Sequence, residues 1–187
     1  MRRILVVVIV AVLTSCGRTP RPEGGDTRRA RGSDTVTGPP RVSPDGLRRI
    51  RAAEALIQHA YDDGVGNLTI GYGHLVRPGE SFVRDITEQR ASALLAEDVA
   101  RVVNPALDRV TVPLSQHQVD ALGSFIFNVG PGNFTRSVLP HLNAGHFDRA
   151  MDHMAKFTHG TNQRTGEQIT LRGLQRRRRA EIALFHS

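Results

Sequence analysis

The sequence predicts a mostly helical α+β domain whose small β piece lies near its start, behind an export signal and a linker. Apolar residues recur at helical spacing over most of residues 43–187. Only residues 61–75 alternate as a strand does, and residues 17–42 contain almost no large apolar side chain. We therefore divide the chain into residues 1–16, 17–42 and 43–187.

The composition excludes several classes of protein. Hydrophobic residues make up 39% of the 187 residues, which is typical of a globular protein and not of a chain disordered throughout. No apolar run approaches the ~18 residues of a membrane-spanning helix, which excludes a multi-span protein. A single cysteine excludes an internal disulfide framework and a cysteine-based zinc site.

The net charge of +7 sits mainly in the N-terminal part of the chain. Residues 1–44 contain eight arginines and three acidic residues, and the remainder carries a net charge of only +2. We therefore expect no nucleic-acid partner, and we interpret the run Arg176–Arg179 as pairing with acids such as Glu181, because four consecutive helical residues point in different directions.

Residues 1–16 have the pattern of a secretory signal peptide, in which two arginines precede the ten-residue apolar run Ile4–Leu13. The segment ends in Leu-Thr-Ser-Cys16, which resembles the lipobox of bacterial lipoproteins, where the cysteine thiol is acylated. We expect a lipid anchor at Cys16 on the periplasmic side of a bacterial membrane. A plain signal peptide and a weak membrane anchor that is later released remain alternatives.

Residues 17–42 are rich in Gly, Pro, Arg and Thr, so we expect a disordered linker. A helix begins at Ser43-Pro44-Asp45, which supply an N-cap hydroxyl, a proline at N1 and an acid in the first turn. Ser115 and Gln118 fit a capping box that opens a buried central helix. The expected helices after the first run over residues 87–103, closed by Asn104-Pro105, and over 115–129, 136–143, 147–158 and 173–185.

A carboxyl group interrupts the apolar stripe of the first predicted helix. The stripe comprises Leu47, Ile50, Ile57 and Tyr61, and Glu54 fills its one gap. A buried carboxylate is costly, and burial favours the protonated form that a general acid needs near neutral pH. A structural glutamate paired with an arginine from elsewhere in the chain is the alternative.

The extended segment adds a second carboxyl group and a hydroxyl. Leu68, Ile70 and Tyr72 are expected on one face, and Thr69, Gly71 and Gly73 on the other, where the glycines leave room for a ligand. Asp63 precedes this strand. Two carboxyl groups and a hydroxyl around one cleft favour glycoside hydrolysis, in which one carboxyl protonates the leaving oxygen and the other orients water.

These residues resemble the catalytic signature of phage-type lysozymes, glycoside hydrolase family 24. The pattern is Glu54, eight residues, Asp63, five residues, Thr69, and then Ile-Gly-Tyr-Gly-His74. The resemblance covers about residues 45–186 and includes the central helix, the segment Phe134–Gly145 and the segment Gly173–Glu181. It implies a lysozyme-like fold with the cleft between a small antiparallel β piece and a mainly helical lobe.

The resemblance also implies roles for single residues. Glu54 would be the general acid, Asp63 would position water or stabilise the charge on the sugar, and Thr69 would hold that water, with inversion at the anomeric carbon. His74 would form a structural ion pair with Asp98. Asn128 would contact substrate, and Gly71 would lie against it.

The resemblance implies that a peptidoglycan hydrolase of this type cleaves the β-1,4 bond between N-acetylmuramic acid and N-acetylglucosamine, as a monomer, without metal or cofactor. A lytic transglycosylase with the same glutamate and a non-catalytic wall-binding lipoprotein are the alternatives. The chain departs from the family in having Phe157 where tryptophan is common, and in the long polar loop His159–Ile169.

Overall fold

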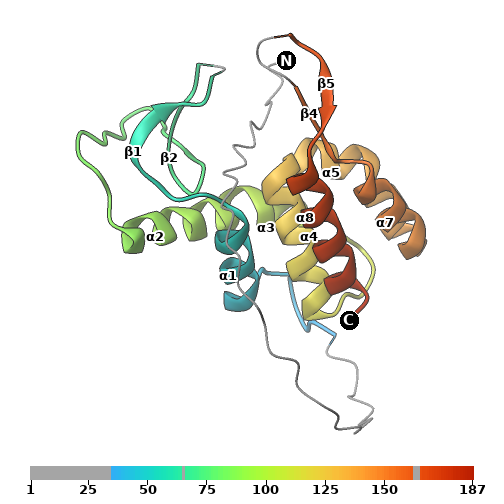
Figure 1. Cartoon of the computed structure of the whole chain (residues 1–187). Helices are drawn as coiled ribbons and strands as arrows, with labels where there is room; N and C mark the ends of the chain where they lie inside the picture. Colours follow the sequence, from blue (N-terminus) through green and yellow to red (C-terminus); the bar gives the residue numbers. More distant parts are fainter. Residues whose placement is uncertain (1–34, 65, 162–164) are drawn as a thin grey trace, which may run out of the picture.

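The computed structural model describes residues 35–64, 66–161 and 165–187, and it has a small β-sheet beside a larger group of helices (Figure 1). This agrees with the predicted fold class. The predicted signal peptide, Cys16 and most of the predicted linker lie outside the described residues. Within the described part of the chain, none of the helices has the length and apolar character needed to cross a bilayer.

The first helix, α1, spans Pro44–Ala53 and begins as predicted, with the Ser43 hydroxyl accepting the N–H of Gly46. It ends earlier than predicted. Glu54 is its C-cap in an extended conformation (φ −107°, ψ 147°), and Ile57 and Tyr61 belong to strand β1. Their spacing suits a helix, but pairing with a neighbouring strand decides the local structure.

The β-sheet consists of β1 (Ile57–Asp62), β2 (Leu68–Gly71) and β3 (His74–Leu75), antiparallel in the order β1-β2-β3. The extended segment therefore starts at residue 57, not at 61. Leu68 and Ile70 lie two residues apart in β2 and so share a face of the strand, but Tyr72 lies in the turn between β2 and β3 and does not extend that face. Ile70 and Tyr72 are buried, whereas Leu68 is exposed.

The second helix was expected to end at Asn104-Pro105, but the helical segment continues past these residues. Helix α2 (Glu88–Asp98) is followed by a π-helical turn, η1 (Val99–Val103), which leads directly into α3 (Asn104–Leu107). In η1 the N–H of Asn104 reaches the carbonyl oxygen of Val99, five residues back. A proline ring collides with the carbonyl four residues before it in a regular α-helix, and a wider π turn relieves this conflict at Pro105.

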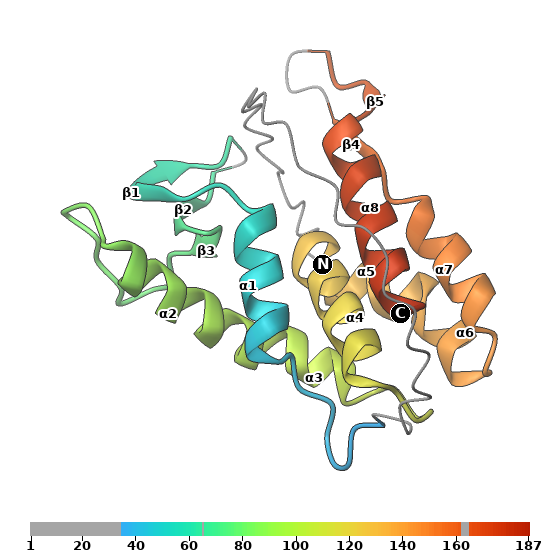
Figure 2. The same ribbon diagram turned by 60° about the horizontal axis from the view of Figure 1, so that its bottom comes forward.

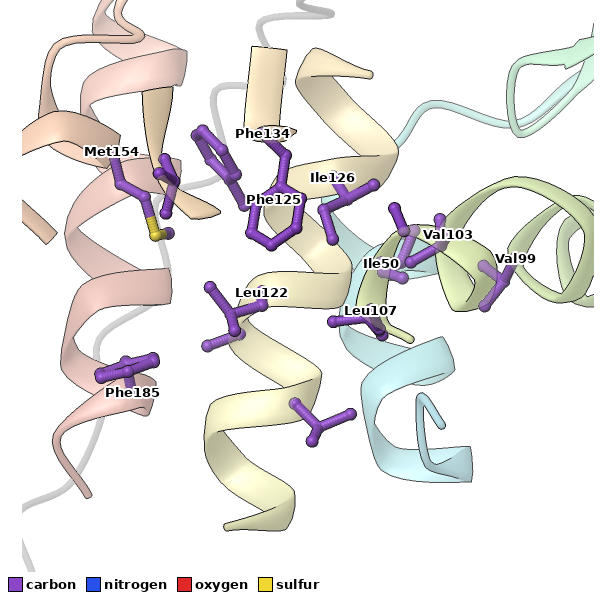
Figure 3. Close-up of a cluster of buried hydrophobic side chains, with 14 of the residues drawn as sticks. Ile50, Val99, Val103, Leu107, Leu122, Phe125, Ile126, Phe134, Met154 and Phe185 are labelled. Atoms are coloured by element: carbon purple, nitrogen blue, oxygen red, sulfur yellow. The ribbon is translucent and has the colours of Figure 1, made fainter. Parts of the chain in front are cut away.

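Helix α4 (Gln116–Val129) is the central helix, and both hydrogen bonds of the predicted capping box are present. It packs mainly against α8 and α1 (Figure 2). Figure 3 shows its core residues Leu122, Phe125 and Ile126 between the labelled side chains of the C-terminal helices and those of α1, η1 and α3. The remaining helices are α5 (Pro131–Ser137), α6 (Leu139–Asn143), α7 (Phe147–Ala155) and α8 (Arg172–Phe185).

Two segments at the edges of the helical part differ from the prediction. The polar loop expected from residue 159 contains an antiparallel pair, β4 (His159–Thr161) and β5 (Gln168–Thr170). Residues 35–42, expected to belong to a disordered linker, lie against the domain: Thr35 bridges to Ser115, and Arg41 pairs with Asp108. We call residues 35–42 the N-terminal strap.

Candidate active site

A cleft of about 310 Å³ lies between the β-sheet and the helices that follow it. Its walls come from the end of α1, the sheet, η1, and the end of α4 with the turn into α5. The cleft brings together Glu54, Asp63, Thr69 and Asn128, four of the residues predicted from the sequence, together with Asp98.

Glu54 reaches the cleft because the chain turns from α1 into β1 at this residue. Its carboxyl is 19% exposed and accepts a hydrogen bond from Arg177 Nη1, at 2.5 Å, 123 residues further along the chain. The Arg177 guanidinium also donates to Glu181 Oε1 at 3.1 Å and to the carbonyl oxygen of Ser124 at 3.2 Å. These bonds to α4 and α8 fix the guanidinium, which in turn orients the Glu54 carboxyl.

A buried polar network supports this arrangement from behind. Glu181 is 4% exposed, and it accepts hydrogen bonds from the Ser124 hydroxyl at 2.7 Å and from Arg178 Nη2 at 3.0 Å. Burial raises the pKa of Glu181 and lowers that of Arg178 to about 10, because it disfavours the charged forms. The interpretation of the arginine run as pairing with acids agrees with these contacts.

Asn128 joins this network to the cleft. Its side chain is 4% exposed, and its Oδ1 accepts a hydrogen bond from Arg178 Nη2 at 2.9 Å. The guanidinium of Arg178 also lies 4.8 Å from the centre of the Phe125 ring, within cation–π distance. The amide of Asn128 is therefore held in one orientation at the cleft wall.

Asp63 is fixed by Asn67, a residue that the sequence reasoning missed. Asp63 Oδ1 accepts the backbone N–H of Asn67 at 3.1 Å, and Oδ2 accepts Asn67 Nδ2 at 2.9 Å. These bonds close the turn between β1 and β2. Burial raises the pKa of Tyr61, and the charges of Asp63 and Glu54 raise it further. Both carboxyl groups therefore influence the ionisation of Tyr61, which lines the cleft.

Thr69 lies on β2 and is 7% exposed, with its side chain at the cleft. Gly71, also on β2, is not among the residues that line the cleft. A Cβ atom built on Gly71 would lie 3.2 Å from the Cβ of Ala91, so this glycine allows β2 to approach α2. The structure therefore places Gly71 against a helix and not at the cleft.

His74 is buried and contacts two carboxylates. Its Nδ1 lies 2.8 Å from Asp98 Oδ2, and its Nε2 lies 3.0 Å from Glu80 Oε2. Burial lowers the pKa of His74, but its hydrogen bonds to Asp98 and Glu80 outweigh this effect, and the net pKa is raised. Glu80 was not predicted, because it lies in the loop between β3 and α2, where the sequence has no periodic pattern.

Within residues 35–64, 66–161 and 165–187, no group of three or more His, Cys, Asp or Glu side chains is arranged as a metal site. The residues that line the cleft supply carboxyl groups, a hydroxyl, amides and the guanidinium of Arg101. A carboxyl oriented by an arginine, with a second carboxyl and a hydroxyl contributed by the facing sheet, can exchange protons with a ligand and orient a water molecule.

Comparisons with known proteins agree with this geometry. A family model described as phage lysozyme matches residues 51–181. An endolysin of Acyrthosiphon pisum secondary endosymbiont phage 1 is 38% identical over 147 residues, covering 78% of this chain and 98% of the relative. The endolysin of Salmonella phage P22 is 36% identical, with the same two coverages.

Among solved structures, the muramidase domain of SpmX from Asticaccaulis excentricus superposes with a TM-score of 0.70 at 34% identity, covering 79% of this chain and 98% of that domain. The residues matched by the family model include every residue that lines the cleft. The chain belongs to the phage lysozyme family and is a glycoside hydrolase of the muramidase type.

Proposed function

We propose that this peptidoglycan hydrolase, a member of glycoside hydrolase family 24, cleaves the β-1,4 bond between N-acetylmuramic acid and N-acetylglucosamine by hydrolysis. The observation that carries the proposal is the convergence of Glu54, Asp63 and Thr69 on one cleft from three separate segments. A sugar chain bound there would present its glycosidic oxygen to Glu54 and the opposite face of the ring to Asp63 and Thr69.

In this mechanism Glu54 donates its proton to the glycosidic oxygen while the bond to the anomeric carbon breaks. Arg177 holds the carboxyl in place during that step. A water molecule held by Thr69 and oriented by Asp63 attacks the anomeric carbon, and its proton passes to Asp63. Attack from the side opposite the leaving oxygen inverts the anomeric configuration.

The test is mass spectrometry of peptidoglycan digested by the full-length chain and by its Glu54→Gln variant. The wild-type protein should release fragments with reducing muramic-acid ends, and Glu54→Gln should reduce the rate by about 10²-fold or more, because removing a general acid typically loses 10²–10⁴-fold. Glu97→Gln is the matched control, since Glu97 is an exposed glutamate outside the cleft.

The products separate this proposal from its alternatives. Anhydro-muramic ends that depend on Glu54 would indicate a lytic transglycosylase. Binding to peptidoglycan without any product would indicate a wall-binding lipoprotein that has lost turnover. Full activity of Glu54→Gln would contradict the assignment of the general acid.

We also propose that the chain is exported and anchored on the periplasmic side of a bacterial membrane through an acylated Cys16. The support is the lipobox-like sequence at residues 13–16 and the position of the only cysteine in it. Two or three acyl chains hold a protein on a membrane stably.

Cys16→Ser should therefore move the protein from the membrane fraction to the soluble fraction after cell fractionation. Ser15→Ala, one residue earlier, is the control and should leave the protein with the membrane. Membrane association of Cys16→Ser equal to that of the wild type would contradict lipidation and favour the apolar run itself as the anchor.

A further inference from the structure

Arg101 differs in charge from every other ionisable residue that lines the cleft. The lining carboxyl groups are those of Glu54, Asp63 and Asp98, and Arg101 is the one arginine or lysine among the lining residues that the structure describes. Its guanidinium therefore places a positive charge in a cleft whose other formal charges are negative.

The position of Arg101 follows from the π-helical turn. The wide turn η1 inserts one residue relative to a regular α-helix, and so changes the direction of the side chains along it. Asp98, Arg101, Val102 and Val103 all line the cleft, although they lie on consecutive turns of one helical segment. Such π turns are frequent at functional sites.

A chain of hydrogen bonds holds Arg101 in place. Its Nη2 donates to Asp98 Oδ1 at 2.9 Å, while the other oxygen of Asp98 contacts His74, and His74 contacts Glu80. The Arg101 side chain remains 49% exposed, and within the described residues its other N–H groups have no hydrogen-bond partner. The guanidinium is thus fixed at one end and available to a ligand at the other.

We propose that Arg101 is a specificity residue that binds a carboxylate of the peptidoglycan substrate beside the scissile glycan. This rests on the proposed function above. The glycan is uncharged apart from its muramic-acid lactyl group, which is either a free carboxylate or joined through an amide to a stem peptide with free carboxylates. A guanidinium matches the planar geometry of a carboxylate and binds it through two N–H groups.

The test measures binding separately from cleavage. The full-length Glu54→Gln protein is titrated by calorimetry with a soluble fragment of two disaccharides bearing tetrapeptide stems. A second titration uses the same fragment after its carboxylates have been converted to neutral methylamides. The additional variants are Arg101→Gln, Arg101→Lys and the matched control Arg90→Gln, all in the Glu54→Gln background.

Arg90 is a close match to Arg101. It is 47% exposed and pairs with an acidic residue on α2, Glu97, at 3.0 Å, but it does not line the cleft. Arg90→Gln should bind both fragments as the parent protein does. Arg101→Gln should raise the Kd for the native fragment about tenfold, as expected for a charge-assisted hydrogen bond. For the neutral fragment, Arg101→Gln and the parent should have the same Kd.

A third ligand identifies the carboxylate. Strands treated with an amidase lose the stem peptide and expose the lactyl carboxylate. If Arg101→Gln raises the Kd for these strands above that of the parent protein, the contact is with the lactyl group. If the two proteins have the same Kd, the contact is with the stem peptide. Either result supports a carboxylate contact.

Two outcomes would overturn the proposal. Equal weakening of the native and neutral fragments by Arg101→Gln would show that Arg101 only supports the fold through Asp98, and no weakening of either would show that it contacts no substrate. If Arg101→Gln fails to fold, Arg101→Lys keeps the charge, and its Kd for the native fragment should be lower than that for the neutral one. Failure of the proposed function is seen separately, as the absence of Glu54-dependent hydrolysis by the wild-type protein.

Discussion

At the scale of single residues, His74 couples the stability of the protein to pH. Its hydrogen bonds to Asp98 and Glu80 raise its pKa in the folded state despite its burial. The folded protein therefore keeps this proton to a higher pH than the unfolded chain does. The resulting stabilisation is fully present below the pKa of an unfolded histidine, and is lost as the pH rises through the folded pKa.

We expect the Tm of the wild-type protein to fall by a few degrees between about pH 6 and pH 9 because of this histidine. His74→Gln should have a lower Tm at pH 6 and a flatter dependence over the same range. The measurement is thermal unfolding followed by circular dichroism, with His59→Gln, an exposed histidine on β1, as the control. A slope in His74→Gln equal to that of the wild type would contradict this role.

Glu80 makes the stability of the protein fall as the pH is lowered, whereas His74 makes it fall as the pH is raised. A hydrogen bond from Arg77, with a further one from His74, lowers the pKa of Glu80 from 4.5 to about 2. Its contribution to stability is present above the pKa of an unfolded glutamate, and is lost as the pH falls toward about 2. The combined contribution of His74 and Glu80 is therefore greatest between the unfolded pKa values of the two residues.

At the scale of the elements, the junction between α4 and α5 depends on one glycine. Gly130 has φ 83° and ψ 154°, a conformation that is essentially restricted to glycine. It ends α4 just after Asn128 and begins α5, so it also shapes the wall of the cleft. A Cβ atom at Gly130 would meet nothing within 4 Å, and the only penalty of a side chain is therefore conformational.

Gly130→Ala should lower the free energy of unfolding by about 1–3 kcal/mol, the usual strain of such a backbone conformation. Gly132→Ala is the control, because Gly132 lies inside α5, where alanine is the better helix former. Its new Cβ would meet only the end of the flexible Arg136 side chain, at 3.3 Å. Urea unfolding of both variants checks the prediction, and equal stabilities would contradict it.

Capping signals in the sequence predicted where helices begin, whereas apolar spacing alone did not predict where the first helix ends. Ser43 and Ser115 are residue types that commonly cap helices, and both predicted caps are present. The end of α1 was predicted wrongly because the apolar spacing from Leu47 to Tyr61 fits a helix, whereas β1 exists only through its pairing with β2. The hairpin at residues 159–170 was missed because its strands are short and polar.

In the candidate site, too, the sequence predicted the features set by neighbouring residues and missed those that depend on long-range packing. The positions of Glu54, Asp63 and Thr69 in one cleft follow from a short stretch of sequence. The sequence could not identify Arg177 as the partner of Glu54, because this contact spans 123 residues and depends on how α8 packs against α4. A run of four arginines signals only that some of these side chains need acidic partners.

At the scale of the whole molecule, the N-terminal strap is part of the folded domain. Its backbone pairs with the segment before α4, through the N–H of Val36 and the carbonyl oxygen of Leu114 at 2.9 Å. Where the strap ends, the backbone and hydroxyl of Ser43 donate to Asp120, which is 3% exposed on α4. These bonds fix the start of α1 on the central helix. Figure 2 shows the strap, in blue, leading into α1.

Val42 is the apolar residue of the strap that enters the contact between the two helices. A Cβ atom built on Gly46 of α1 would lie 2.6 Å from its side chain, and one built on Gly123 of α4 would lie 2.4 Å from it. Both distances are too short for real atoms, so the two glycines form the space that Val42 occupies. Substitutions in the strap, in α1 and in α4 should therefore have non-additive effects on the free energy of unfolding.

A double-mutant cycle tests this coupling in the full-length chain. Gly123→Ala alone should lower the free energy of unfolding by about 1–3 kcal/mol through overpacking against Val42. Val42→Ala alone should lower it by about 1 kcal/mol, because it removes half-buried methyl groups. In the Val42→Ala background the clash is absent, and Gly123→Ala should be neutral or stabilising by up to about 1 kcal/mol, the difference in helix propensity between glycine and alanine. Urea unfolding of the four proteins gives the coupling energy, and additive effects of the two substitutions would show that the strap does not bind between α1 and α4.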